Sequence, residues 1–148
     1  MNHISLAGEW QLYDDTGAHV TRVTFPTDLI TALHAAGHIP DPYWGMNEYD
    51  VRWVAERDWT ARRHFALTAD QTGADLVVSR LDTIATIRVN GRLVAATENA
   101  FRRYRLPLSD WLVAGSNEIE ITFHAPVRAA AERQASQSYF VPFTEHYP

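Results

Sequence analysis

Four carboxylates lie close together near the middle of the chain, where acid–base chemistry has to be considered. They are Glu48, Asp50, Glu56 and Asp58. Two carboxyl groups catalyse proton transfer when one has a raised pKa and the other stays ionised. Glu56 and Asp58 flank Arg57, and two more arginines, Arg62 and Arg63, follow. This spacing favours ion pairs between the acids and the arginines over a catalytic pair.

Other reactive arrangements find little support in the sequence. There is no Gly-x-Ser-x-Gly segment and no phosphate-binding loop. The chain has no cysteine, which excludes a thiolate nucleophile, disulfides and Cys-ligated zinc. His34 and His38 are four residues apart, but Gly37 intervenes and no Glu follows His34 as in a zinc-protease helix. We therefore expect no metal and no cofactor.

Length and charge restrict the classes of partner. The chain has 148 residues, which is one domain's worth, and a net charge of −5. The acidic balance argues against a nucleic-acid partner, and Arg102, Arg103 and Arg105 are predicted to lie on a solvated or ion-paired strand face. No apolar run approaches the ~18–20 residues of a membrane span. With no signal peptide and no cysteine, we expect a cytoplasmic location.

The arginine-rich segment that follows the carboxylates has the pattern of a strand. In residues 59–67, apolar and polar side chains alternate, which predicts a half-buried β-strand with Trp59 in the core. Arg63 breaks the alternation because it lies on the apolar side. We expect it to be a buried structural charge, paired with a carboxylate or backbone carbonyls, or reaching the edge. Trp44 and Trp53 precede this strand in a turn-rich segment, and the sequence leaves open whether Trp44 is core or surface.

Short strands separated by turns dominate the rest of the chain. Strands are predicted at 4–13, 20–25, 59–67, 74–81, 84–89, 93–96, 101–108 and 117–123, with helices at 27–36 and 126–134 and a helical turn at 110–114. The dipeptide Asn90-Gly91 between apolar runs predicts a β-hairpin. Residues 74–81 are apolar on both faces and are expected inside a sheet that is covered on both sides. We predict an all-β fold, an antiparallel jelly-roll β-sandwich with two or three short helices.

Two ordered sets of residues resemble a known family. The first runs from Asp41-Pro42-Tyr43 through Asn47-Glu48 and Asp58-Trp59 to Arg62-Arg63, and it resembles the N-terminal domain of β-mannosidases of glycoside hydrolase family two. The second comprises Ala85, Val89-Asn90-Gly91, Ser109-Asp110, Gly115 and Asn117-Glu118-Ile119, and it resembles the sugar-binding domain of that family. Together the two sets cover nearly the whole chain.

The resemblance implies a galactose-binding-like jelly roll at the N-terminus of a multidomain retaining exo-glycosidase that removes terminal β-mannose. The two catalytic glutamates of such enzymes lie on a barrel domain, which needs about 250 residues of its own. The family's Trp-Asp-Trp-Gly-Pro segment is not in this sequence. Residues 1–148 are therefore expected to be a single N-terminal domain, a fragment of a longer enzyme and inactive alone. Its implied partners are the barrel domain of the same polypeptide and the parent enzyme's oligosaccharide substrate.

The resemblance also assigns roles to the turn-rich segment. Asn47-Glu48 is similar to the Asn-Glu pair that contains the acid/base in this enzyme class, but its place in the N-terminal domain argues against catalysis. Instead, Trp44, Asn47, Arg52 and Trp53 are expected to contact the barrel domain or support the active-site rim, on an exposed apolar surface. The alternative is a free-standing carbohydrate-binding module, with Tyr43, Trp44 and Trp53 as a sugar platform.

Overall fold

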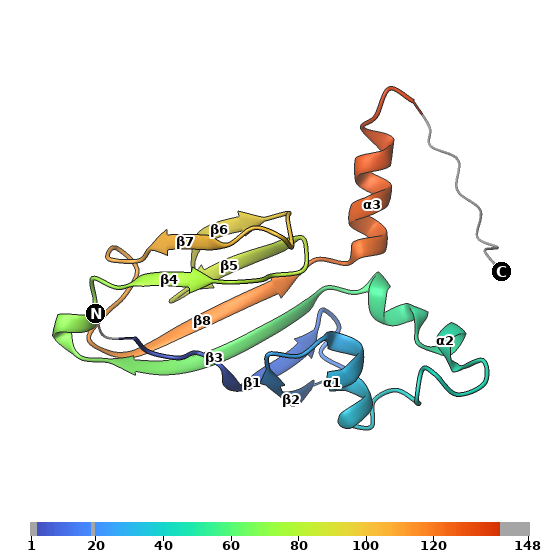
Figure 1. Cartoon of the computed structure of the whole chain (residues 1–148), viewed down its shortest axis with the longest axis horizontal. Helices are drawn as coiled ribbons and strands as arrows, with labels where there is room; N and C mark the ends of the chain where they lie inside the picture. Colours follow the sequence, from blue (N-terminus) through green and yellow to red (C-terminus); the bar gives the residue numbers. More distant parts are fainter. Residues whose placement is uncertain (1–2, 19, 140–148) are drawn as a thin grey trace.

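The computed structural model describes residues 3–18 and 20–139 (Figure 1). The strands are β1 (Gly8–Asp14), β2 (Val20–Phe25), β3 (Trp59–Leu67), β4 (Asp75–Val78), β5 (Ala85–Val89), β6 (Arg92–Thr97), β7 (Tyr104–Pro107) and β8 (Gly115–Phe123). The helices are α1 (Leu29–Ala35), α2 (Asn47–Asp50), α3 (Pro126–Ala135) and two 3₁₀ helices, η1 (Arg52–Glu56) and η2 (Ala69–Gln71). No helix in the described ranges is both long and apolar enough to cross a membrane.

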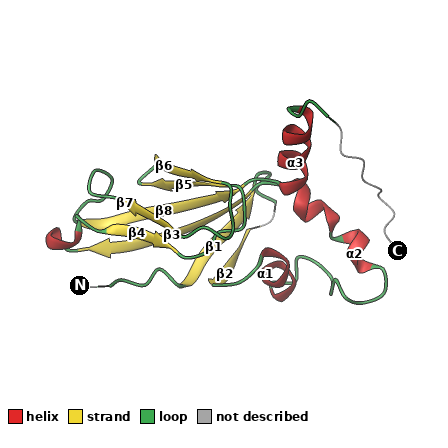
Figure 2. Cartoon of the chain, turned by 45° about the horizontal axis from the view of Figure 1, so that its top comes forward, coloured by secondary structure: helices red, strands yellow, loops and turns green. Residues whose placement is uncertain are grey.

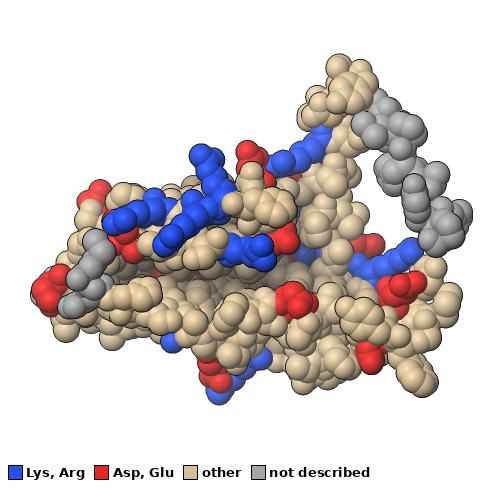
Figure 3. Space-filling view, in the orientation of Figure 1, with Lys and Arg blue, Asp and Glu red and all other residues tan. Residues whose placement is uncertain are grey.

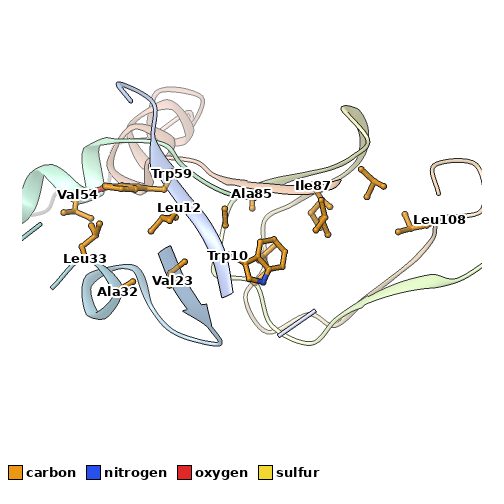
Figure 4. Close-up of a cluster of buried hydrophobic side chains, with 14 of the residues drawn as sticks. Trp10, Leu12, Val23, Ala32, Leu33, Val54, Trp59, Ala85, Ile87 and Leu108 are labelled. Atoms are coloured by element: carbon orange, nitrogen blue, oxygen red, sulfur yellow. The ribbon is translucent and has the colours of Figure 1, made fainter. Parts of the chain in front are cut away.

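The described strands form two antiparallel sheets. The larger has six strands in the order β2-β1-β3-β8-β5-β6, and the smaller pairs β4 with β7. The smaller sheet lies over one face of the larger, and α1, α2 and α3 gather at one end of the sheets (Figure 2). Buried side chains from the larger sheet and from α1 form most of the core, as Figure 4 shows for Trp10, Leu12 and Leu33. Half-buried Leu76, Val78 and Leu106 of the smaller sheet pack against it. The predicted all-β antiparallel sandwich is confirmed.

Strand β3 is the centre of the larger sheet, and its bounds match the predicted strand. It pairs with β1 on one side and along its full length with β8 on the other, from Trp59 opposite Phe123 to Leu67 opposite Gly115. Arg63 is half-buried rather than buried, and its guanidinium reaches the segment that precedes β1. There Nη1 donates to the carbonyl oxygens of Leu6 and Ala7 over 3.0 and 2.7 Å. The expectation of a buried charge is corrected, and backbone carbonyls are its partners.

The predicted hairpin is confirmed at Asn90-Gly91, which joins β5 to β6. Both residues have positive φ, 51° and 75°, as a type I′ turn requires. The Asn90 side chain also leaves the turn and binds a neighbouring segment. Its Nδ2 donates to the carbonyl of Trp111 over 2.8 Å and to Oδ1 of Asn117 over 2.9 Å. The turn is thus fixed to the loop that precedes β8.

Several sequence-based boundaries are wrong. Residues 74–81 do not form an interior strand: β4 is four residues long, pairs only with β7 among the described strands, and leaves Val77 40% exposed. Its apolar outward residue reflects strand propensity rather than burial. Helix α1 begins at Leu29, two residues later than predicted, because Asp28 is its N-cap: the Asp28 carboxylate accepts from the Thr31 N–H over 2.8 Å. The helical turn predicted at 110–114 begins earlier, because the Leu112 N–H donates to the carbonyl of Leu108, four residues back, over 3.0 Å.

A charged cluster lies on the outer face of the larger sheet. The Glu120 carboxylate accepts hydrogen bonds from Arg62 Nε over 2.9 Å, from Arg62 Nη2 over 2.5 Å and from the Tyr13 hydroxyl over 3.0 Å. Burial acts to raise the pKa of Glu120, but the hydrogen bonds from Arg62 and Tyr13 outweigh it. The pKa is therefore lowered from its ordinary value of 4.5.

This lowered pKa predicts an acid-sensitive contribution to stability. The contribution is complete above the unfolded-state pKa of Glu120 and is lost as pH falls through the lower, folded-state pKa. We expect Glu120→Gln to flatten the fall in unfolding free energy below about pH 4.3, as measured by urea denaturation from pH 7 to pH 3. Glu9→Gln is the control, because the Glu9 carboxylate is exposed and pairs with the exposed Arg22. Equal acid sensitivity in wild type and Glu120→Gln would contradict the assignment.

Candidate functional site

The segment between α1 and β3 forms a structured loop at the helical end of the molecule (Figure 1). The Asp41 carboxylate accepts from the backbone N–H of Tyr43 over 2.9 Å, and Asn47 Nδ2 donates to the Asp41 carbonyl over 2.8 Å. Short polar side chains that bind their own backbone in this way stabilise turns. The Asn47 side chain therefore holds the loop together and is half-buried.

The loop that Asp41 and Asn47 stabilise exposes large apolar side chains to solvent. The most exposed are Tyr43 at 96%, Trp44 at 76%, Met46 at 69% and Tyr49 at 48%. Arg52 lies against the same surface, with its Cζ atom 4.4 Å from the centre of the Tyr49 ring. We call residues 43–52 the aromatic loop. The question that the sequence left open for Trp44 is answered: it is a surface residue.

Trp53 lies beneath the aromatic loop rather than on it. It is half-buried, its ring centre is 6.0 Å from that of Trp59, and the guanidinium of Arg57 lies 4.9 Å above it. Trp59 is 1% exposed and donates from Nε1 to the Val54 carbonyl over 3.0 Å. Trp53 and Trp59 thus connect the loop to the core. Of the four residues expected at an interdomain contact, Trp44 and Arg52 are exposed, and Asn47 and Trp53 support them.

The carboxylates of Glu48, Asp50, Glu56 and Asp58 do not form one reactive group. Glu48, Asp50 and Glu56 are exposed. Asp58 is ion-paired, as expected, but its partner is Arg128 of α3, at 2.5 Å. The nearby arginines bind elsewhere: Arg57 pairs with Asp14, and Arg62 with Glu120. The expected partners were wrong because adjacent residues of a strand point to opposite faces, so charges pair across strands.

Asp58 belongs to a network that the sequence did not reveal. His124 Nε2 lies 2.7 Å from the Thr86 hydroxyl, and His124 Nδ1 lies 3.3 Å from the Asp58 carboxylate. A hydroxyl, an imidazole and a carboxylate in this order resemble a catalytic triad. Asp58 also accepts from the Ala125 N–H over 2.7 Å and from Arg128. Because the network joins β3, β5 and β8 to the start of α3, we interpret it as the anchor of that helix.

The histidines that are spaced like metal ligands do not converge on a site. His34 Nδ1 lies 3.4 Å from the Ile39 carbonyl in the turn after α1. Within residues 3–18 and 20–139, no three His, Cys, Asp or Glu side chains come close enough to hold a metal ion. Arginines gather over the smaller sheet (Figure 3), where Arg105 pairs with Asp75 at 2.6 Å and Arg102 and Arg103 are exposed. The solvated and ion-paired strand face predicted there is confirmed.

A deep cleft separates the two sheets. Its volume is about 1860 Å³, and its lining includes the inward-facing Phe65, Ile121 and Phe123 of the larger sheet. Every residue from Gly73 to Ile84 borders the cleft, as do the N-terminal segment 3–7 and residues 25–30. Because the lining is mostly aliphatic and aromatic, the cleft suits an apolar occupant better than a sugar.

Comparison with known proteins identifies the domain. Residues 10–148 match the family described as glycosyl hydrolase 2 galactose-binding domain-like. The chain belongs to this family. The galactose-binding-like fold is therefore established by the sequence match as well as by the two antiparallel sheets.

Relatives of this glycosyl hydrolase 2 domain are much longer proteins. The chain is 36% identical over 132 residues to a probable beta-mannosidase of Caenorhabditis elegans, with 88% of this chain and 15% of that protein covered. It is 34% identical over 143 residues to the beta-mannosidase of Bos taurus, and the match covers 94% of this chain and 16% of that protein. The chain thus spans about a sixth of the length of these relatives.

Solved structures agree with the family assignment. The β-D-mannosidase of Dictyoglomus thermophilum superposes with a TM-score of 0.89 and 30% identity, covering 94% of this chain and 18% of that chain. The β-D-glucuronidase of the same organism superposes with a TM-score of 0.60 and 19% identity over 81% of this chain and 19% of that chain. The second likeness shows the fold alone. The resemblance to β-mannosidases that the sequence motifs indicated is confirmed.

Proposed function

We propose that this chain is the N-terminal accessory domain of a retaining exo-β-mannosidase, which hydrolyses terminal non-reducing β-D-mannose residues. In this proposal the two catalytic glutamates lie on a barrel domain of the same polypeptide. The aromatic loop contacts that domain and supports the rim of its active site. The observation that carries this role is the exposure of Trp44 on a loop whose shape Asn47 holds.

The loop has the properties of a positioning surface rather than of a reactive one. Retaining glycosidases hold two carboxyl groups about 5–5.5 Å apart, one as nucleophile and one as acid/base. The carboxylates near the loop are exposed or bound by arginine, as Asp58 is by Arg128. Trp44 and Tyr43 instead offer broad apolar surface with few rotatable bonds, which suits a contact between domains.

The proposal that this domain supports catalysis but does not perform it is tested by comparing the 148-residue chain with the longer polypeptide. The 148-residue chain is expected to give no hydrolysis of p-nitrophenyl β-D-mannoside, whereas the longer polypeptide that contains it is expected to hydrolyse it with retention. Release of p-nitrophenol is followed by absorbance. Turnover by the 148-residue chain would overturn the proposal, as would a longer polypeptide that does not act on β-mannosides.

Replacing Trp44 by alanine in the longer polypeptide is expected to lower kcat/KM for the mannoside about tenfold, because one contact that orders the rim is lost. In the 148-residue chain the same substitution is expected to change the melting temperature by no more than about a degree, since Trp44 is 76% exposed there and an exposed side chain contributes little to folding. Phe101→Ala is the matched control, because Phe101 is 93% exposed on a different loop. Equal values of kcat/KM in the two variants and in wild type would show that Trp44 does not support the active-site rim.

A second function is favoured by the same exposed aromatics. A free-standing carbohydrate-binding module presents rings on which sugars stack, and Tyr43 and Trp44 are both available to solvent. Calorimetric titration of the 148-residue chain with mannobiose separates the two functions. Micromolar binding that Trp44→Ala abolishes would favour the module, and no binding at millimolar mannobiose is expected for the accessory domain.

A further inference from the structure

The two sheets of the sandwich are unequal in width. Neighbouring strands lie about 4.8 Å apart, so six strands extend over about 24 Å whereas two extend over about 5 Å. The pair β4–β7 therefore covers only part of the inner face of the larger sheet. A two-stranded ribbon is also only marginally stable by itself. The smaller layer needs further contacts to cover the core.

The cleft between the sheets lies where that cover is incomplete. Its floor contains Phe65, Ile121 and Phe123, which pack against the core but are only half-buried. One wall is formed by β4 and the residues on either side of it, and none of the four residues of β7 borders the cleft. Segments 3–7 and 25–30 also border the cleft. The cleft thus runs along the side of β4 that faces away from β7.

The hydrogen-bond pattern shows which backbone groups face the cleft. The Leu108 N–H donates to the Ala74 carbonyl over 3.2 Å, which continues the β4–β7 ladder by one residue pair. In an antiparallel ladder, bonded and non-bonded pairs alternate. Leu76 therefore bonds to β7, and the N–H and C=O groups of Asp75 and Val77 point to the free edge. The position of Pro107 opposite Asp75 agrees, because proline has no N–H to donate.

We propose that a further strand of the same polypeptide, from outside residues 1–148, pairs with this free edge of β4. Its alternate apolar side chains cover Phe65, Ile121 and Phe123. An extended backbone is the ligand that satisfies a row of edge N–H and C=O groups, and an apolar floor selects its side chains. The relatives contain several times the length of this chain, and a covalently linked strand binds at high effective concentration.

This inference rests on the proposed function only because both place the chain in a longer polypeptide. Residue-resolved hydrogen exchange tests it without measuring activity. The amides of Asp75 and Val77 are expected to exchange at least about tenfold more slowly in the longer polypeptide than in the 148-residue chain. The amide of Leu76, which bonds to β7 in both, is the internal reference. Equal exchange of Asp75 and Val77 in the two proteins would overturn the proposal.

Two substitutions at one position make the test specific. Val77→Pro removes the edge N–H, whereas Val77→Ala keeps it and trims a side chain that is 40% exposed. In the longer polypeptide, Val77→Pro is expected to melt several degrees below Val77→Ala. In the 148-residue chain the two variants are expected to melt together. A similar difference in both proteins would show strain instead, and dimerisation of the 148-residue chain with protected Val77 would show that a second copy fills the edge.

Discussion

Replacing Trp59 by alanine is expected to lower the free energy of unfolding by about 3–5 kcal/mol, the range for removing a large aromatic side chain from a core. Trp59 is 1% exposed, and its indole lies against Trp53 while Nε1 donates to the Val54 carbonyl. The substitution removes apolar contacts at the start of β3 and leaves that carbonyl without its donor. Because whole domains are stable by about 5–15 kcal/mol, the variant is expected to be partly unfolded at 37 °C.

Urea denaturation followed by circular dichroism measures this loss without relying on tryptophan emission. Trp59→Phe is the graded control: it keeps most of the apolar volume, loses the hydrogen bond to Val54, and is expected to lose less. Trp44→Ala is the matched surface control, because Trp44 is 76% exposed, and a change within about 0.5 kcal/mol is expected. A loss below about 1 kcal/mol for Trp59→Ala would show that the core closes over the gap.

Local patterns in the sequence predicted the strands well where one face of the strand is buried. The bounds of β2 and β3 match the predicted ranges, and the Asn90-Gly91 hairpin lies where the turn chemistry placed it. In these segments the alternation of side chains and the sign of φ are dictated by residues that are adjacent in sequence. The segment 74–81 failed because its outward-facing Val77 is apolar although it is exposed.

Pairings between distant residues are invisible to such patterns. Asp58 binds Arg128, which is 70 residues away, and nothing in the spacing of the two residues indicates it. Proximity in the sequence predicted Arg57, Arg62 and Arg63 as partners of Asp58. These arginines bind other groups instead: Arg57 binds Asp14, Arg62 binds Glu120 and Arg63 binds the Leu6 carbonyl. Only the order of strands in the sheet, with β3 beside β8, brings the start of α3 to Asp58.

The sequence predicted that the four candidate site residues lie close together along the chain, but not which of them are exposed. The sequence placed Trp44, Asn47, Arg52 and Trp53 in one loop, but helices as short as α2 and η1 contain too few residues to show a period. The side of the loop on which each residue lies depends on the turn that Asp41 and Asn47 stabilise. That turn exposes Trp44 and leaves Trp53 against Trp59.

Two residues of the set that resembles the family's sugar-binding domain contact each other and have a structural role. Asn90 and Asn117, which lie in separate motifs, bind each other through Asn90 Nδ2 and Asn117 Oδ1 over 2.9 Å. Asn117 is 1% exposed and is fully bonded: Nδ2 donates to the carbonyls of Val113 and Gly115 over 2.7 and 3.1 Å, and Oδ1 also accepts from the Val113 N–H over 2.9 Å. These residues fasten the β5–β6 hairpin to the loop before β8.

Replacing Asn117 by leucine, which has a similar size, is expected to destabilise the domain by about 3 kcal/mol or more. Each buried polar group that is left without a partner costs about 1–3 kcal/mol. The Val113 N–H and carbonyl both lose the Asn117 side chain, whereas the Asn90 amide loses one bond and keeps its bond to the Trp111 carbonyl. Urea denaturation measures the loss. A change below about 1 kcal/mol would show that solvent replaces the side chain.

Asn90→Gly separates the contact from the turn, because glycine keeps the positive φ of 51° that this position adopts and removes only the side chain. Asn117→Leu and Asn90→Gly together form a double-mutant cycle. Because the two side chains share a hydrogen bond, the double variant is expected to lose less than the sum of the single variants, with a coupling of about 0.5–3 kcal/mol. Additive losses would mean that each asparagine acts only on its own segment, and that the two motifs contribute to the fold independently.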